Sequence, residues 1–142
     1  MARRGTGRPT DLELEILKVL WEQGPSTVRA VQERLSEERR VGYTTVLKML
    51  QIMDEKGLVV RDDSQRAHIY RPRHSRRTVV GRLANDLLER VFDGSAAQLV
   101  VHALSQKKAK PEELAEIRRL LDEMEGGTDE RRHDAAARRK RR

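Results

Sequence analysis

The chain has 142 residues, which is enough for one compact domain with a small helical addition, and its formal net charge is +7 at pH 7. It contains no cysteine, which excludes disulfides, thiolate metal sites and cysteine nucleophiles. No stretch approaches the roughly 18 apolar residues of a membrane span, and no apolar run follows the N-terminal arginines as in a signal peptide. We therefore expect a cytoplasmic protein without membrane insertion, and the basic balance favours a polyanionic partner.

The charged residues are unevenly distributed. Residues 1–77 contain 16 Lys and Arg against 11 Asp and Glu, residues 78–126 contain 7 against 9, and residues 127–142 contain 7 against 3. The composition predicts a disordered basic arm over residues 1–9 and a disordered basic tail over residues 127–142. One Trp, two Tyr and one Phe are too few for the stacking platforms that single-stranded nucleic acid requires, so this ligand is disfavoured.

The first two predicted elements are helices. Thr10 and Glu13 have the spacing of a capping box, so the first helix begins after Thr10, and apolar residues at helical spacing continue it to Gly24. Ser26 and Thr27 provide the next cap, and the apolar positions after them fit one face of a second helix. The polar residues 36–42 connect this helix to the next.

A third helix is predicted over residues 43–56, with Gly57 at its C-terminal cap. Val46, Leu50 and Met53 follow one another at i, i+4 and i+7 and form its apolar side. The opposite side is polar. The pattern therefore predicts one buried and one exposed face.

After the third helix the period of the sequence changes. Residues 58–61 and 67–71 have the composition and alternation of strands, and a polar turn at residues 62–65 separates them. Pro72 ends the second strand. These features predict a β-hairpin.

Three helices followed by a hairpin is the order of a winged helix-turn-helix domain, with the hairpin as the wing. We assign residues 10–74 to this domain and residues 75–126 to a helical dimerisation region. The predicted fold class is mainly α with a small β-hairpin wing.

The second half of the chain contains three more amphipathic helices. Apolar stripes predict them over residues 75–93 and 96–105, and from Pro111 to the pair Gly126 and Gly127. So small a segment seldom buries enough apolar surface to be stable alone. It either folds back onto the first domain or, as we expect, pairs with a second copy around a two-fold axis. The predicted dimerisation residues are Val80, Leu83, Leu87, Val91, Leu99, Val100, Leu104, Leu114, Ile117 and Leu121.

The third helix, the wing and the N-terminal arm carry the residues expected to contact DNA. The first residues of a recognition helix reach base edges, and hydroxyl, amide and ammonium groups bind bases or phosphates. The arm and the wing each add an arginine. The predicted DNA-binding residues are Arg8, Tyr43, Thr44, Thr45, Lys48, Gln51 and Arg66.

Nothing in the sequence indicates an enzyme. The four histidines are scattered, and neither a glycine-rich phosphate loop nor a nucleophile motif occurs, so we expect no cofactor, no metal and no catalysis. For the third helix taken alone, a solvated face is the simpler interpretation, but the hairpin and the basic flanks favour DNA. Two alternatives remain: an architectural, nucleoid-type DNA-binding protein that uses its basic tails, and a protein-interaction module that binds no DNA.

Short motifs along the chain match a known family in sequence and in order. They are Leu12–Trp21, Gly24–Arg29, Tyr43–Val46, Glu55–Val59, Arg66-Ala67, Tyr70–Pro72 and Phe92–Ser95. Together they extend over nearly all of the chain from Thr10 to Met124. By these motifs the chain resembles the penicillinase-repressor family of bacterial winged-helix regulators, typified by the β-lactamase and methicillin-resistance repressors.

The resemblance implies a homodimer that binds an inverted-repeat operator and represses transcription, with genes of β-lactam resistance or the cell envelope as targets. In the family, a membrane-bound sensor and protease system relieves repression by cleavage of an Asn-Phe bond in the dimerisation region. The corresponding pair here is His102-Ala103, so cleavage at this point requires a protease with another preference. The absence of cysteine excludes the sensing mode of the family's copper-responsive branch.

Overall fold

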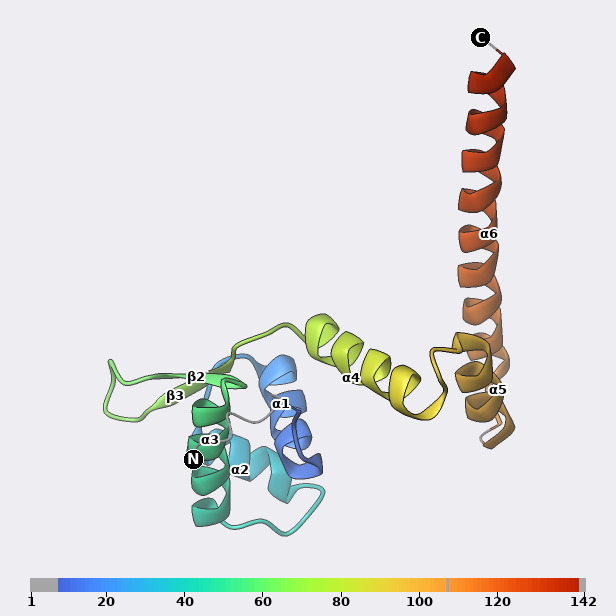
Figure 1. The fold of residues 1–142 in the computed structure, drawn as a ribbon. Coiled ribbons are helices and arrows are strands. Elements are labelled where there is room, and N and C mark those ends of the chain that lie inside the picture. Colours follow the sequence, from blue (N-terminus) through green and yellow to red (C-terminus); the bar gives the residue numbers. More distant parts are fainter. Residues whose placement is uncertain (1–7, 107, 141–142) are drawn as a thin grey trace. The chain divides into compact units, whose positions relative to one another are not determined.

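The structure is a computed structural model that describes residues 8–106 and 108–140 (Figure 1). The chain forms two compact units, Met1–Val91 and Phe92–Arg142. The first unit includes helix α4 (Arg76–Val91). The division between the units therefore follows this helix, whereas we predicted the domain boundary before it.

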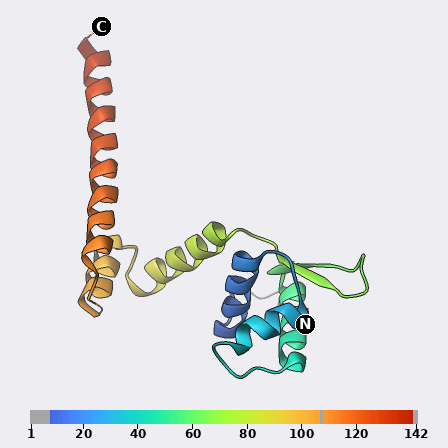
Figure 2. The ribbon, with the colours of Figure 1, turned by 180° about the vertical axis from the view of Figure 1, so that it is seen from behind.

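The first unit consists of three helices, a small sheet and a fourth helix. Figure 2 shows the ribbon of Figure 1 from behind. In chain order its elements are α1 (Asp11–Gln23), β1 (Ser26–Thr27), α2 (Val28–Ser36), α3 (Tyr43–Lys56), β2 (Val59–Asp62), β3 (Ile69–Pro72) and α4. Helices α2 and α3 form the helix-turn-helix pair, and strands β2 and β3 form the wing. The predicted winged-helix fold is confirmed.

The ends of the first three helices follow from their local sequence. The Thr10 hydroxyl accepts a hydrogen bond from the Glu13 amide at 3.3 Å, and the Glu13 carboxylate accepts one from the Thr10 amide at 3.0 Å, which confirms the capping box. The Thr27 hydroxyl accepts from the Ala30 amide at 3.1 Å and caps α2. Gly57 ends α3 in the left-handed conformation, with φ 79°, which glycine adopts without steric cost.

The sheet contains one strand that we did not predict. Its order is β1-β3-β2, and both pairs of neighbours are antiparallel. Ser26 and Thr27, predicted only as a helix cap, pair with Tyr70 and Ile69 of β3. Two residues are too few to show alternation, so only the position of β3 beside them makes them a strand. The wing loop at residues 63–68 is also longer than the predicted turn.

The core of the first unit lies between helices α1 to α3 and the sheet. Its completely buried apolar side chains are Ile16, Val31, Val46, Leu50, Met53, Val59 and Tyr70. Helix α4 joins this core through Val79, which is buried, and Leu83, which packs against it. The indole N–H of Trp21 donates to the His74 carbonyl at 3.1 Å, which ties α1 to the segment before α4.

The second unit consists of α5 (Ala96–Gln106) and α6 (Pro111–Lys140). A turn precedes α5, in which Asp93 and Gly94 have φ values of 49° and 80°. The Ser95 hydroxyl accepts a hydrogen bond from the first turn of α5 and caps this helix. The beginnings of both helices agree with the prediction from the sequence.

Helix α6 does not end at Gly126 and Gly127, where the sequence analysis expected it to end, whereas the disorder expected for residues 127–142 stays a prediction. The backbone remains α-helical to Lys140, and neither glycine has a positive φ. A glycine costs a helix about 1 kcal/mol relative to alanine, and the many Ala, Arg and Glu residues around the pair favour the helix enough to continue it. Residues 141–142 of the predicted tail and residues 1–7 of the predicted arm lie outside the described residues.

Candidate nucleic-acid interface

Helix α3 has one buried and one exposed side, as predicted. Its three inward residues at i, i+4 and i+7 are completely buried. The exposed side holds four of the predicted DNA-binding residues, namely Thr44, Thr45, Lys48 and Gln51. Within the described part of the chain, no carboxylate pairs with Lys48. The polar side of α3 is therefore available to a ligand.

The first turn of α3 is suited to an anion. The helix begins after Gly42, and no side chain caps its first amide groups. The helix dipole and these N–H groups favour a phosphate at this end. Tyr43, the first residue of the helix, lies at the same end and is 51% exposed.

A groove of about 480 Å³ runs beside the N-terminal end of α3. Strand β1, helices α2 and α3 and the wing contribute its lining residues, which are Thr27, Val28, Arg29, Tyr43, Leu47, Arg66, Ala67 and His68. The structure thus brings Tyr43 and Arg66, which are far apart in the sequence, to one surface. The groove has apolar walls and a cationic rim, which suits the sugar-phosphate backbone of a nucleic acid.

Arg29 is a candidate site residue that the sequence analysis missed. It is the second residue of α2 and lines the groove together with Arg66. Its ion pair with Glu33 is long, at 3.9 Å, and the two side chains are 82% and 69% exposed, so the pair holds Arg29 only weakly. In sequence the two residues look like a solvated i,i+4 pair. Only the tertiary position of the wing distinguishes Arg29 from other surface arginines.

The carboxylates of the wing have partners within the wing. Asp63 forms an ion pair with Arg61 at 2.7 Å and lies 3.6 Å from His68 Nδ1, and its charge raises the pKa of Arg61. Hydrogen bonds from Ser64 lower the pKa of Asp62. Among the described residues, no carboxylate pairs with Arg66. Arg66 is therefore free to face a phosphate, while the charge of Asp63 is offset locally.

The structure does not bring Arg8 together with the other predicted DNA-binding residues. Its guanidinium pairs with Asp86 of α4, and Asp86 also lies 3.7 Å from Arg90. Arg8 lines a separate pocket at α4. The packing of α4 against the core of the first unit places Asp86 beside Arg8, a contact that the local sequence does not reveal.

The structure separates the four predicted dimerisation residues of α4 into two sets. Leu83, one turn after Val79, packs against the core of the first unit. The structure therefore gives Leu83 a contact within its own chain, whereas we predicted that it belongs to the dimerisation stripe. Val80, Leu87 and Val91 are 45%, 43% and 61% exposed. These three residues follow one another at i, i+7 and i+11 and form a stripe of their own.

The predicted dimerisation residues of the second unit are exposed or only partly buried. Helix α5 has no buried residue. The exposed members are Val100, Leu104 and Leu121, and the partly buried ones are Leu99, Leu114 and Ile117. Contiguous exposed apolar residues are typical of an association surface.

The pair His102-Ala103 lies in the interior of α5, and both residues are exposed. The His102 ring lies 5.5 Å from the ring of Phe92, with the two planes inclined by 48°. A peptide bond inside a helix is protected by that helix, so cleavage here requires local unfolding of α5.

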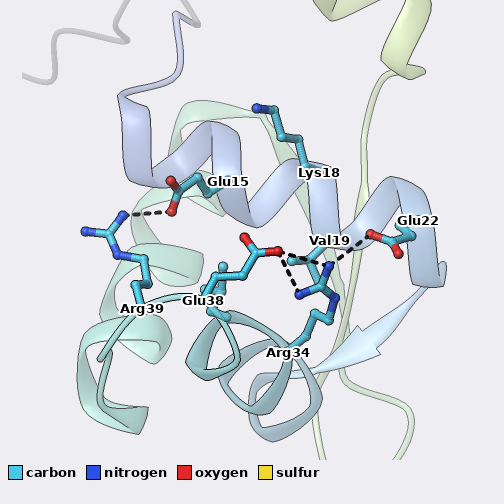
Figure 3. A pocket seen from close by; sticks show the side chains of 8 residues that line it. Glu15, Lys18, Val19, Glu22, Arg34, Glu38 and Arg39 are labelled. Carbon is cyan, nitrogen blue, oxygen red and sulfur yellow. Dashed lines mark hydrogen bonds and ion pairs between the residues drawn. The ribbon is translucent and has the colours of Figure 1, made fainter.

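Another pocket, of about 540 Å³, lies between α1 and α2. Figure 3 shows that its two arginines face carboxylates: Arg34 approaches Glu22 at 3.7 Å, and Arg39 donates to Glu15 at 2.7 Å. Lys18 lies at the same pocket (Figure 3). Because the charges are mixed and both arginines are paired with carboxylates, we do not assign this pocket to DNA.

In residues 8–106 and 108–140, no group of three or more His, Cys, Asp or Glu side chains could hold a metal ion. None of the helices there combines the length and the apolarity needed to cross a membrane.

Comparison with known proteins places the chain among bacterial regulators. A family model described as "Penicillinase repressor" matches residues 9–123. The transcriptional regulator BlaI of Mycobacterium tuberculosis is 39% identical over 129 residues, which cover 89% of this chain and 92% of that protein. The penicillinase repressor of Bacillus licheniformis is 25% identical over 114 residues, covering 80% and 89%. The solution structure of monomeric B. licheniformis BlaI with the blaP half-operator is 26% identical, covers 49% of this chain and 84% of that one, and has a TM-score of 0.43.

Proposed function

The chain belongs to the penicillinase repressor family, and on this premise we propose that it is a cytoplasmic homodimer that represses transcription from an inverted-repeat operator. Members of this family are transcriptional repressors, so the chain is a repressor and not an enzyme, as the sequence analysis predicted. The regulated genes in our proposal are those of β-lactam resistance or the cell envelope.

The observation that supports operator binding most strongly is the exposed polar side of α3 next to a cationic groove. In the proposed complex, α3 lies in the major groove of duplex DNA. Thr44, Thr45, Lys48 and Gln51 then face the base edges. Tyr43, Arg29 and Arg66 line one groove beside the N-terminal end of the helix, and there they contact the phosphate backbone and fix the register of α3.

Dimerisation would make this interface specific. A single recognition helix contacts few base pairs, whereas two copies related by a two-fold axis match an inverted repeat. In the first unit the exposed stripe Val80, Leu87 and Val91, and in the second unit the apolar residues of α5 and α6, each supply apolar surface for association. We propose that this surface joins two copies of the chain and sets the spacing of their α3 helices.

Relief of repression by a membrane sensor and protease system is the regulatory part of the proposal. The proposed cleavage region is His102-Ala103 in α5. Helix α5 has no buried residue, so its local unfolding exposes little core and costs less than unfolding of the first unit. Cleavage there would detach α6 from the rest of the chain and remove part of the association surface.

Selection of bound fragments from the source genome, followed by affinity measurement, tests the proposal. We expect the wild-type protein to select an inverted repeat and to bind it far more tightly than random duplex of the same length. Equal affinity for both duplexes would contradict the proposed operator specificity.

Two lysine variants locate the interface. Lys48→Ala should weaken operator binding by about 1–3 kcal/mol if Lys48 contacts a base. Lys18→Ala removes the same charge from the pocket between α1 and α2 and should leave the affinity unchanged. Equal losses in both variants would indicate an effect of net charge alone and would contradict the assignment of α3.

A further inference from the structure

A pocket of about 760 Å³ lies between helix α4 and the residues that precede α1, within the first unit. It is larger than the groove beside α3 and shares no lining residue with that groove. The proposed function therefore does not use it. Its volume falls in the range of pockets that hold small organic molecules.

Three apolar side chains line this pocket, namely Leu58, Val79 and Leu83. Leu58 and Val79 are 5% and 7% exposed and belong to the core of the first unit, and Leu83 packs against that core. Because core packing holds these side chains in place, the apolar part of the pocket exists before a ligand arrives. A preformed surface of this kind favours binding, since few groups have to be ordered when the ligand enters.

Three arginines also line the pocket, namely Arg8, Arg82 and Arg90. Asp86 is the single carboxylate among the lining residues, and it pairs with Arg8 and lies 3.7 Å from Arg90. Within the part of the chain that the structure describes, no carboxylate pairs with Arg82. Three guanidinium groups therefore face one carboxylate, which leaves the pocket with an excess of positive charge.

We propose that this pocket binds a small organic carboxylate with an apolar body. Asp86 supports a carboxylate as the charged group, because two of the three guanidinium groups already bind one there. The ligand carboxylate pairs with Arg82, and its body covers the three apolar side chains. An uncharged apolar molecule would leave Arg82 unpaired, and a small inorganic anion would leave the apolar side chains uncovered. The proposal does not depend on operator binding.

Trp21 reports on the pocket without any label. His74 lines the pocket, and its carbonyl accepts a hydrogen bond from the Trp21 indole N–H at 3.1 Å. Because the chain contains one tryptophan, this N–H gives a single indole signal in a proton–nitrogen correlation spectrum of the full-length protein. A ligand in the pocket should shift this signal, and titration of the shift gives its dissociation constant.

Three probes separate the two parts of the proposed ligand. Octanoate has a carboxylate and an apolar body, octanamide has the same body without the charge, and acetate has the charge without the body. We expect octanoate to shift the Trp21 signal with a dissociation constant of roughly 1–10 mM, as so small a molecule allows. Octanamide and acetate should each bind at least about fivefold more weakly, because each lacks one of the two contacts.

Two variants with the same change of charge test the role of Arg82. Arg82→Gln should raise the dissociation constant of octanoate roughly threefold, because an exposed ion pair is lost, and should leave that of octanamide unchanged. Arg77→Gln is the control, since Arg77 lies on α4 but does not line the pocket, and it should bind octanoate as wild type does. Both arginines are exposed, so both variants should fold. A wild-type Trp21 signal before the probe is added checks this.

Four results would overturn the inference. A Trp21 signal that octanoate leaves in place would show that the pocket holds no such ligand. Equal affinity for octanoate and octanamide, or equal losses in Arg82→Gln and Arg77→Gln, would show that the pocket does not select the charge. Displacement of octanoate by a random DNA duplex would assign the arginines to phosphates of DNA. The proposed operator specificity is judged separately, by the ratio of operator to random affinity in the wild-type protein.

Discussion

At the scale of single residues, Glu13 is a completely buried carboxylate at the start of α1. Its Oε1 accepts hydrogen bonds from the Lys56 ammonium at 2.7 Å and from the Thr10 amide at 3.0 Å. Burial, the largest influence, raises the pKa of this carboxyl, but the hydrogen bonds from Lys56 and Thr10 together outweigh it, and the pKa lies below its ordinary value. The contact joins the first turn of α1 to the last residue of α3.

We expect Glu13→Gln to lower the free energy of unfolding at pH 7 by about 1–3 kcal/mol, because a charge-assisted hydrogen bond to Lys56 is lost. The folded-state pKa lies below the unfolded one, so the carboxylate stabilises the fold above the unfolded-state pKa near 4.5. This contribution disappears as the pH falls through the folded-state pKa. Between about pH 6 and pH 3, wild type should therefore lose more stability than the variant.

Urea unfolding followed by circular dichroism across this pH range measures both effects. Glu15→Gln, two residues along the same helix, is the control. The Glu15 side chain is 42% exposed and pairs with Arg39 at the surface, where such a pair contributes about 0–1 kcal/mol. If Glu13→Gln and wild type lost stability in parallel on acidification, the role assigned to Glu13 would be wrong.

At the scale of elements, the junction between α3 and the wing sets the position of the candidate interface. Gly57 ends α3 with φ 79° and ψ 20°, and the Leu58 amide donates to the Met53 carbonyl at 2.9 Å. Strand β2 begins two residues after Gly57. The left-handed residue therefore reverses the chain sharply enough to bring the wing back beside α3.

We expect Gly57→Ala to destabilise the protein by about 1–2 kcal/mol, because the left-handed conformation is strained in any residue with a Cβ. The cost comes from the backbone, since an added Cβ meets only Arg73 Nε at 3.8 Å, an ordinary contact. Thermal unfolding measures the change.

Gly81→Ala is the matched control for this prediction. Gly81 lies within α4, and a methyl group added to it would meet no atom within 4 Å. The same substitution there should stabilise the helix by up to about 1 kcal/mol. Equal effects of the two substitutions would contradict the conformational explanation.

At the scale of the whole molecule, the described chain leaves apolar helix surface uncovered in both units. Helix α4 uses one side for the core, through Val79 and Leu83. Its stripe Val80, Leu87 and Val91 remains exposed. A second copy of the chain is the proposed partner of this surface, because the same stripe on both copies can meet across a two-fold axis.

We expect Leu87→Asp to shift the protein from dimer to monomer and to weaken operator binding, because the substitution places a carboxylate within an apolar contact. Leu87 is 43% exposed in the single chain, so the first unit should still fold. Sedimentation velocity measures the oligomeric state. Asn85→Asp adds the same charge to α4 off the stripe and should leave the dimer intact. Unchanged association in Leu87→Asp would exclude the stripe from the interface.

The sequence determined the features that depend on neighbouring residues. The capping box at Thr10 and Glu13, the glycine end of α3 and the change of period after it all act over a few positions. These features predicted the winged helix and the exposed polar side of α3. The predicted end of α6 was wrong because a glycine pair lowers helix propensity only locally, and the residues on both sides outweigh it.

Tertiary structure decided the features that depend on residues far apart in the chain. Strand β1 exists because β3 lies beside it, and Arg29 belongs to the candidate interface because the wing completes its groove. Arg8 lies away from that groove because its guanidinium pairs with Asp86 of α4. In each case the partner is distant in sequence, and no local period or propensity carries information about contacts formed only when the chain packs.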